Sequence, residues 1–242
     1  MKIKAIIFDK DGTLLDFDAF WISVAIGAVS DILKTVGANE ALTDDMLASV
    51  GADRETASLD GLLCKGTYEQ ISKAFYDVLT KSEYSIGYGS FYDLVVEAFH
   101  NNIPKGRVIP TCDNIKAVFE NLQSMKIKTA VVTTDDKYVT EKCLEELGIK
   151  EFFSRIYTDD GVNPSKPNPY YITKFCEDEG INPNELLMVG DTLTDMNFAE
   201  NGKIKAIGVA KSEEGRQLLK SKAYAVVNDI SKILYVINSM EE

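Results

Sequence analysis

A regular alternation of short apolar runs with helical patterns, beginning at Thr111 and continuing to the C-terminus, most constrains how this chain can fold. The runs are rich in β-branched residues, and in the segments between them apolar side chains recur every three or four positions. Strands joined through helices of this length form right-handed βαβ units. The alternation therefore predicts an α/β fold with a doubly wound parallel sheet.

The first strand of this sheet is expected at Ala5–Phe8, near the N-terminus. Later strands are expected at 128–133, 155–158, 186–190, 206–209 and 223–227. The helices between them are expected at 113–125, 137–147, 169–179 and 195–200, with one more at the C-terminus.

The segment between the first strand and residue 104 has a different pattern. Helical spacing predominates there, without a clear buried strand, at 16–37, 39–50, 67–79 and 91–99. Turn formers at 101–106 mark a return to the α/β pattern. We therefore predict a helical subdomain over 16–103, inserted into a core formed by 1–15 and 104–242.

Composition narrows the kind of protein and its partners. The 242 residues are 45% hydrophobic and 26% charged, which is typical of a globular protein with a sizeable core. A net charge of −12 opposes binding to nucleic acid. No run is expected to reach the ~18–20 apolar residues of a membrane span, and the four cysteines form no metal-binding pattern. We expect a cytoplasmic protein that binds neither nucleic acid nor a membrane.

Two carboxylates follow the first strand. Because side chains on a strand alternate, Asp9 and Asp11 are expected on one side, with Lys10 pointing away. Gly12 then allows a turn. This arrangement suits a nucleophile or a metal ligand at the carboxyl edge of a parallel sheet, where α/β proteins bind their ligands. The alternative is an ordinary turn with solvated acids.

Two further segments could bind a phosphate group. Thr133 and Thr134 follow the strand at 128–133, where a hydroxyl and backbone N–H groups precede a helix. The alternative is that Thr134 or Asp135 only caps that helix. Lys166 lies in a proline-braced loop before another helix, which would hold its ammonium stiffly against an anion.

A second pair of acids follows the strand at 186–190. Asp191 and Asp195 are four residues apart, so both carboxylates can face one cavity if a helix begins there. Oxygen ligands of this kind suit Mg²⁺. The alternative is that Asp191 or Thr194 caps the helix.

Together these motifs resemble, in order and spacing, those of the haloacid dehalogenase-like (HAD) hydrolase superfamily. The motifs are Asp9-Lys10-Asp11-Gly12-Thr13-Leu14, Thr133, Lys166-Pro167 and Gly190-Asp191-Thr192-Leu193-Thr194-Asp195. The resemblance implies a Rossmann-like core, a C1-type helical cap, one Mg²⁺ and phosphoryl transfer through an aspartyl-phosphate.

The resemblance also implies a role for each residue. Asp9 would be the nucleophile and a metal ligand. Asp11 would serve as general acid and then general base, and its backbone carbonyl would help bind Mg²⁺. Asp191 would bind Mg²⁺ beside Asp9. The phosphate-binding groups would be the Thr133 hydroxyl, the Thr134 N–H and Lys166, with Asp195 orienting Lys166 or a metal-bound water.

With an acid at position 11, the first motif resembles that of the phosphatase branches of the superfamily. The motifs of dehalogenases and P-type ATPases differ, because they lack an acid at this position. The expected activity is thus hydrolysis of a small phosphorylated metabolite by a phosphoglycolate phosphatase-like enzyme. A β-phosphoglucomutase-like sugar-phosphate mutase keeps the same core motifs and is the main alternative. A non-catalytic binding or regulatory module is a weaker one. The motifs indicate no oligomeric state.

Substrate choice would depend on the cap. Within it, the loop at 60–67 is the best candidate for substrate contact, because Lys65 could reach an anionic leaving group and the flanking glycines allow close approach. The alternative is a simple connection in which Thr67 caps the next helix.

Overall fold

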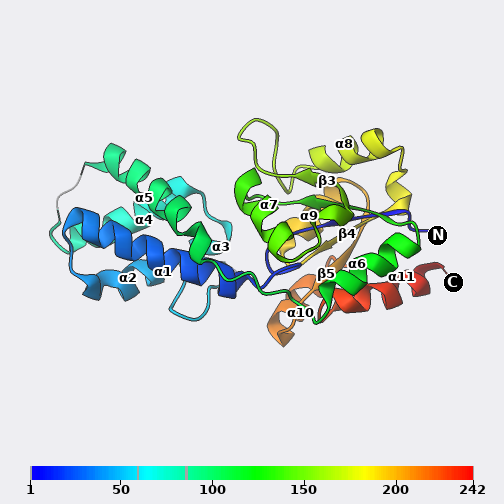
Figure 1. The fold of residues 1–242 in the computed structure, drawn as a ribbon, viewed down its shortest axis with the longest axis horizontal. Coiled ribbons are helices and arrows are strands. Elements are labelled where there is room, and N and C mark those ends of the chain that lie inside the picture. The colour runs from blue at the N-terminus through cyan, green and yellow to red at the C-terminus, as the bar shows by residue number, and fades with distance from the viewer. Residues whose placement is uncertain (1, 59, 85–86, 242) are drawn as a thin grey trace. The chain divides into compact units, whose positions relative to one another are not determined.

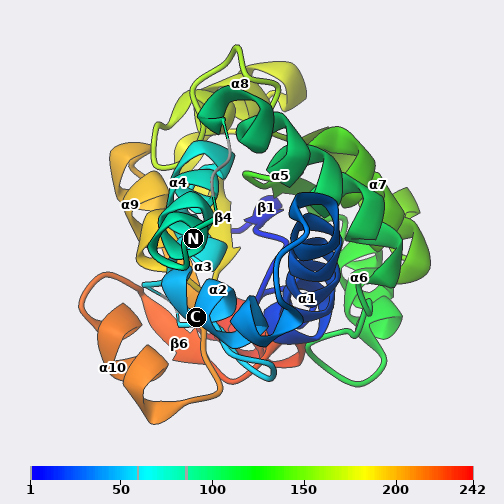
Figure 2. The same cartoon turned by 90° about the vertical axis from the view of Figure 1, so that its left-hand side faces the viewer.

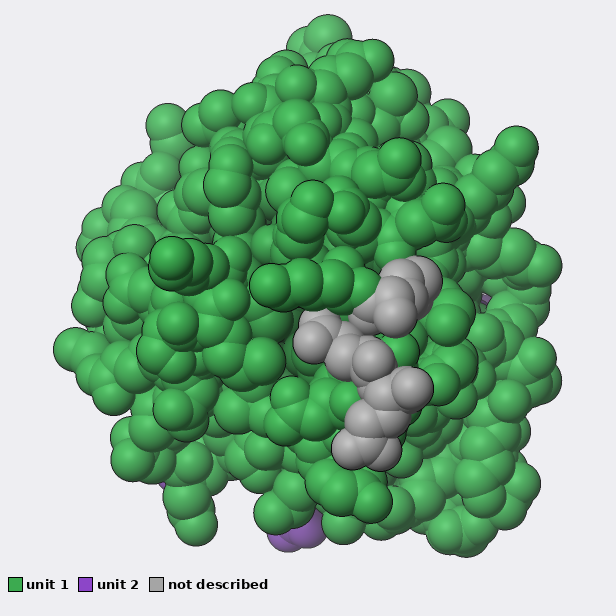
Figure 3. All heavy atoms as spheres, turned by 90° about the vertical axis from the view of Figure 1, so that its right-hand side faces the viewer, with its two compact units in different colours: residues 1–16, 108–242 green, residues 17–107 purple. Residues whose placement is uncertain are grey.

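A computed structural model describes residues 2–58, 60–84 and 87–241. The chain divides into two compact units, a core unit of residues 1–16 and 108–242 and a helical unit of residues 17–107 (Figure 1). Figure 3 shows part of the core unit's surface in green.

In the described part of the core unit, six parallel strands form one sheet in the order β3-β2-β1-β4-β5-β6. The order places the first strand at the centre, so the chain winds outward from it in both directions. The predicted doubly wound, Rossmann-like α/β fold is confirmed. The strands are β1 (Ala5–Phe8), β2 (Lys128–Val132), β3 (Phe153–Tyr157), β4 (Leu186–Gly190), β5 (Lys205–Val209) and β6 (Ala225–Val227).

Each face of the sheet has its own hydrophobic cluster, because successive strand side chains point in opposite directions. Phe8 belongs to the cluster that contains residues of α6, α7 and α11, and Ile7 to the one that contains residues of α8, α9 and α10. Burying an Ile or Phe side chain contributes roughly 1.5–3 kcal/mol, so both faces stabilise the sheet. The helices are α6 (Ile115–Ser124), α7 (Lys137–Glu146), α8 (Tyr170–Glu179), α9 (Leu193–Asn201), α10 (Glu213–Lys220) and α11 (Ile233–Glu241).

Helix α10 was not predicted. It lies between β5 and β6, and Ser212 caps its first turn by accepting a hydrogen bond from the N–H of Gly215 (3.1 Å). Leu219 is its only large apolar side chain that is fully buried. The helix has only eight residues, and its two large apolar residues, Leu218 and Leu219, are adjacent, so the sequence offered no apolar repeat at three or four positions.

The helical unit contains five α-helices among its described residues (Figure 2). Its core combines aliphatic side chains with aromatic rings: Phe75 stacks on Phe99, with ring centroids 6.4 Å apart, and Phe91 is also fully buried. At the contact of α1 with α5, a Cβ on Gly27 would lie 2.2 Å from the Asn102 side-chain oxygen, so this close approach needs a glycine. The helices are α1 (Phe17–Val36), α2 (Thr43–Ser49), α3 (Leu62–Lys65), α4 (Tyr68–Lys81) and α5 (Tyr88–Asn102).

The expectation that no run reaches the length of a membrane span is wrong for α1. This helix has 20 residues and a mean hydropathy of 1.5, and among the described helices it alone passes that test of length and composition. Half of the apolar window is buried inside the structure, as in the core helix of a folded unit. Packing within the helical unit therefore accounts for its apolar character.

Candidate functional site

The register of the sheet brings three strand ends together. Phe8 of β1 pairs with Val131 of β2 and with Val189 of β4, so the chain leaves these strands at one edge. The residues that follow are those singled out in the sequence: Asp9 and Asp11 after β1, Thr133 after β2, and Asp191 after β4. Segments more than a hundred residues apart thus meet at the carboxyl edge of the sheet.

Lys166 links the acids that follow two different strands. Its Nζ lies 2.5 Å from Oδ1 of Asp9 and 2.7 Å from Oδ1 of Asp195, and all three residues are buried. Burial and the charges of Asp195 and Asp11 raise the pKa of Asp9 to about 7, although Lys166 acts in the opposite direction. Burial lowers the pKa of Lys166, but the two carboxylates outweigh it and hold that pKa above its usual value. Lys166 is therefore a fixed cation beside Asp9.

Asp195 is held on both of its oxygens. Oδ1 accepts from Lys166, while Oδ2 accepts from the hydroxyl of Thr192 at 2.6 Å and from its N–H at 3.1 Å. Thr192, rather than Asp191 or Thr194, is the N-cap of α9, so the capping alternative was wrong in its residues. The carboxylate of Asp195 is thereby fixed in a position that orients Lys166.

Asp191 touches the turn that follows β1. Its Oδ1 accepts a hydrogen bond from the hydroxyl of Thr13 at 3.1 Å. Gly12 has a φ of +72°, and a Cβ at that position would lie 2.0 Å from Oδ2 of Asp191. Glycine is therefore required here for both conformation and space. Desolvation, with the charges of Asp9 and Asp195, raises the pKa of Asp191 well above its usual value.

These acids fit a divalent cation. Carboxylate oxygens of Asp9, Asp191 and Asp195 lie within 4.8 Å of one another. Because both oxygens of Asp195 accept other donors, Asp9 and Asp191 are the better ligands. The surroundings are rich in negative charge, and an all-oxygen donor set suits Mg²⁺.

Thr133 lies at the same edge and is buried, whereas Thr134 is exposed. The N–H of Thr133 donates to the carbonyl of Tyr157 in the neighbouring strand, so its hydroxyl is the group available for phosphate. Neither Thr134 nor Asp135 caps α7. The N-cap is Asp136, whose carboxylate accepts from the N–H of Val139 at 2.9 Å.

Lys10 is the residue that the sequence interpretation misplaced. It does not point away from the site residues: its Nζ lies 2.6 Å from Oδ2 of Asp11 and 2.8 Å from Oδ2 of Asp135. Strand β1 ends at Phe8, so the alternation assumed for positions 9 to 11 no longer applies. The solvated-acid alternative was also wrong, since Asp9 is buried and Asp11 is only partly exposed.

Lys65 belongs to the helical unit. It ends the short helix α3, is exposed, and pairs with Asp60 at 2.6 Å. Thr67 caps α4 and forms a capping box with Gln70, as the alternative reading of this loop predicted.

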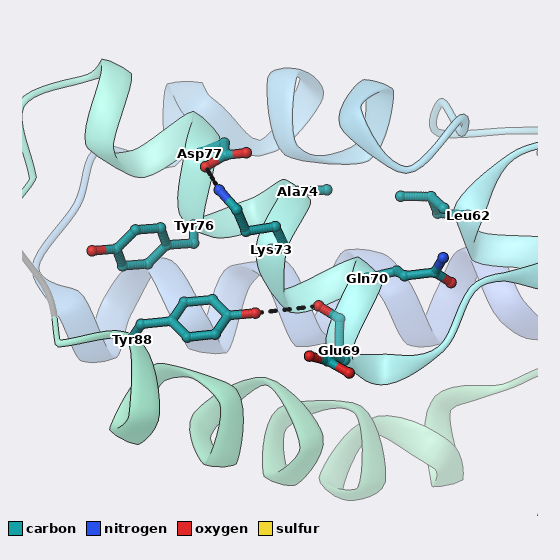
Figure 4. A pocket seen from close by; sticks show the side chains of 8 residues that line it. All are labelled: Leu62, Glu69, Gln70, Lys73, Ala74, Tyr76, Asp77 and Tyr88. Carbon is teal, nitrogen blue, oxygen red and sulfur yellow. Dashed lines mark hydrogen bonds and ion pairs between the residues drawn. The ribbon is translucent and has the colours of Figure 1, made fainter.

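A hollow of about 730 Å³ lies within the same unit, lined mainly by α4 (Figure 4). Tyr88, at the start of α5, also lines the hollow. Its hydroxyl donates a hydrogen bond to the backbone carbonyl of Glu69 at 3.4 Å. Lys73 lies within the hollow and pairs with Asp77. The charged side chains of Lys73 and Asp77 are both largely exposed to water.

The fold and the site thus define an α/β protein in which carboxylates and a lysine lie together at the carboxyl ends of parallel strands. A family model for haloacid dehalogenase-like hydrolases matches residues 3–203, and the chain belongs to that family. The PpaX pyrophosphatase of Bacillus cereus (strain AH820) is 26% identical over 244 residues, covering 99% of each chain. That of Bacillus anthracis is 25% identical with the same coverage. The predictions of a HAD-type hydrolase and of a phosphatase-type enzyme are confirmed.

Solved structures share the fold. A predicted phosphoglycolate phosphatase from Haemophilus somnus 129PT has a TM-score of 0.69 at 22% identity, covering 98% of each chain. A protein described as a β-phosphoglucomutase from Thermotoga maritima also has a TM-score of 0.69, at 20% identity, covering 98% of this chain and 99% of its own. The magnesium-bound HAD hydrolase YfnB from Bacillus subtilis has a TM-score of 0.68 at 17% identity, covering 98% and 100%.

Proposed function

We propose that the chain is an Mg²⁺-dependent phosphomonoester hydrolase that acts on a small phosphorylated metabolite through an aspartyl-phosphate on Asp9. The observation that carries this proposal is the buried Asp9 carboxylate, fixed by Lys166 at 2.5 Å beside Asp191. A fixed cation next to a carboxylate favours its ionised form and offsets the charge of an incoming phosphate.

In the first step, an oxygen of Asp9 attacks phosphorus, and the bond from phosphorus to the substrate oxygen breaks. The electron pair of that bond remains on the leaving oxygen, which takes a proton from Asp11. Lys166 and the Thr133 hydroxyl would contact the transferring phosphoryl oxygens, with the N–H of Thr134 as a third donor.

In the second step, water attacks the phosphorus of the aspartyl-phosphate, and Asp11 accepts a proton from that water. The Asp9 carboxylate is regenerated and phosphate leaves. Asp195 keeps Lys166 in place through both steps, since its two oxygens are held by Lys166 and Thr192.

Asp9, Asp191 and the backbone carbonyl of Asp11 would hold Mg²⁺. When bound, the ion neutralises charge so that an anionic carboxylate can approach an anionic phosphate. The protein's contribution is to fix the ligands: Thr13 holds Asp191, and Gly12 leaves room for it.

The helical unit is proposed to act as a C1-type cap that selects the substrate and excludes water. Its connections to the core unit fall at residues 16–17 and 107–108. Lys65 is exposed and held by one exposed partner, Asp60, so it can exchange that partner for an anionic group of the substrate.

The names of the relatives guide the choice of substrates. Pyrophosphate and phosphoglycolate belong in the assay panel, because relatives and structural neighbours carry these names. The sugar-phosphate mutase remains the second candidate, with a neighbour of that description at a TM-score of 0.69. A cytoplasmic location and the absence of nucleic-acid or membrane partners remain predictions.

The test is phosphate release from this panel, with Mg²⁺ and with a chelator. Asp9→Asn is the matched control, because it removes the nucleophile at nearly constant volume. We expect release that requires Mg²⁺ and falls at least ~10³-fold in the variant.

Isomerisation of a sugar phosphate without net phosphate release would identify the mutase instead. Full activity of a purified Asp9→Asn enzyme would contradict the covalent route. Absence of both activities with a tightly bound phosphate ester would favour the non-catalytic module.

A further inference from the structure

A second ammonium group, that of Lys10, is buried beside Asp11. Lys10 has no exposed surface, and its Nζ lies between Oδ2 of Asp11 at 2.6 Å and Oδ2 of Asp135 at 2.8 Å. The mechanism described above uses Asp11 but neither Lys10 nor Asp135.

A buried cation of this kind is costly unless its partners are well placed. An apolar side chain of similar volume would fill the same space without desolvating a charge, so stability alone does not account for such a bridge. With no exposed surface, the Lys10 ammonium depends on these two ion pairs, to Asp11 at 2.6 Å and to Asp135 at 2.8 Å.

One end of the bridge is fixed by the backbone. The N–H of Asp135 donates to the hydroxyl of Thr133 at 3.2 Å, and its carbonyl accepts from the N–H of Asp159 at 2.9 Å. The loop after β2 thus presents the Asp135 carboxylate from a set position.

The other end is the proton donor. The backbone around it is held by the N–H of Gly12, which donates to the carbonyl of Leu15 at 2.8 Å, and by the N–H of Leu14, which donates to the carbonyl of Lys10 at 2.8 Å. These bonds fix the main chain but leave χ1 and χ2 of Asp11 to be set by side-chain contacts. The contact with Lys10 restricts them.

We propose that Lys10 is a positioning residue: anchored by Asp135, it orients the carboxylate of Asp11 for proton transfer to the leaving group. This inference rests on the proposed function, in which Asp11 is the general acid.

The test compares two leaving groups, because an orienting role affects only substrates that need a proton. The alkoxide of an alkyl phosphate must be protonated as it leaves, whereas the phenolate of p-nitrophenyl phosphate leaves without help. The single-turnover rate of phosphoryl transfer to the enzyme is measured for each substrate. This step is chosen because Asp11 acts later as a base with both.

Lys10→Met is expected to slow the alkyl phosphate about 10- to 100-fold and p-nitrophenyl phosphate less than about threefold. Asp135→Asn, which loosens the anchor at constant volume, is expected to shift the rates in the same direction by a smaller factor. A crystal structure of Lys10→Met should show the Asp11 carboxylate in a different rotamer. Lys4→Met is the matched control, since Lys4 precedes the same strand but pairs with Glu185 at the surface.

Equal slowing of both substrates, or none, in folded Lys10→Met would overturn the inference. If that variant does not fold, the same comparison in Asp135→Asn decides the question. Wild-type activity that Asp9→Asn abolishes is established first, so an unselective Lys10→Met effect counts against this inference alone. Wild-type protein without activity would overturn the proposed function and this inference together.

Discussion

The functional site of the core unit and the helical unit hold their charged side chains in opposite ways. In the core, Lys166 reaches two buried carboxylates, Asp9 and Asp195, that lie far from it and from each other in sequence. Among the described residues of the helical unit, the ion pairs are exposed and join residues close in sequence, as between Lys65 and Asp60.

This difference indicates which unit supports catalysis and which unit recognises the substrate. Long-range buried pairs require the whole sheet to form before the site exists, so the site is rigid and sensitive to substitution. Short-range exposed pairs contribute little to stability, so their members can be exchanged or recruited by a ligand. We therefore expect catalysis to depend on the core and substrate choice on the helical unit.

Substitution of Lys166 in the core unit and of Lys65 in the helical unit tests this contrast most strongly. Lys166→Met leaves Asp9 and Asp195 buried without their cation, which should lower the free energy of unfolding by about 3–5 kcal/mol. Turnover should fall at least ~10²-fold. Lys65→Met should change stability by less than about 0.5 kcal/mol. Urea unfolding and initial rates measure both, and similar losses in the two variants would contradict the contrast.

Divalent cations should stabilise the core unit. At 100 times its dissociation constant, Mg²⁺ is expected to add about 2.7 kcal/mol to the free energy of unfolding. Asp191→Asn should remove most of this gain, because it replaces a proposed ligand at constant volume. Thermal melts with Mg²⁺ and with chelator measure the effect, and an unchanged gain in Asp191→Asn would contradict the assignment.

In the metal-free protein, ionisation of the closely spaced carboxylates of the site should lower the free energy of unfolding. The pKa of Asp9 is raised from 3.8 to about 7, so the stability linked to its proton is present below pH 3.8 and lost as pH rises toward 7. Wild type should therefore lose stability relative to Asp9→Asn between about pH 4 and 7. Parallel melts of the two proteins in chelator across this range give the difference, and a flat difference would contradict the shift.

Two glycines separate backbone conformation from site geometry. Gly12 and Gly148 both have positive φ, +72° and +65°, but only at Gly12 would a Cβ meet another group, Asp191 at 2.0 Å. Gly148→Ala should cost about 1–2 kcal/mol from conformation alone. Gly12→Ala should in addition weaken Mg²⁺ binding about 10- to 100-fold. Titration of Mg²⁺ against thermal stability measures this, and equal Mg²⁺ affinity in both variants would contradict the role of Gly12.

The smallest effect is expected in the helical unit. Lys65→Ala should raise KM a few-fold for the preferred substrate, because an exposed ion pair is worth about 0.2–1 kcal/mol, and leave kcat unchanged. Kinetics on the best substrate of the panel test this. A fall in kcat with unchanged KM would move Lys65 from recognition to chemistry.

The sequence predicted the sheet because most of its strands contain short apolar runs bounded by helical patterns. It placed Asp9, Thr133 and Asp191 at strand ends, and strand register then explains why they meet. Helix α10 escaped because its two large apolar residues, Leu218 and Leu219, are adjacent and form no helical repeat.

The bridge from Lys10 to Asp135 could not be predicted in the same way. Its members lie on different strand-end loops, and the strand alternation assumed for Lys10 ends at Phe8. One signal was present: a charged residue directly after a buried apolar strand must find partners, and Asp135 follows a neighbouring strand of the sheet. The capping role of Thr192 was equally hidden, because several residues near it could cap the same helix.

The central claim is that Asp9 carries the phosphoryl group, and trapping this intermediate tests it most directly. Enzyme quenched in acid during turnover and treated with borohydride would have an acyl-phosphate reduced to the corresponding alcohol, which peptide mass spectrometry can locate. We predict homoserine at position 9, dependent on substrate and Mg²⁺ and absent from Asp9→Asn. Reduction at another carboxylate, or none during active turnover, would contradict the claim.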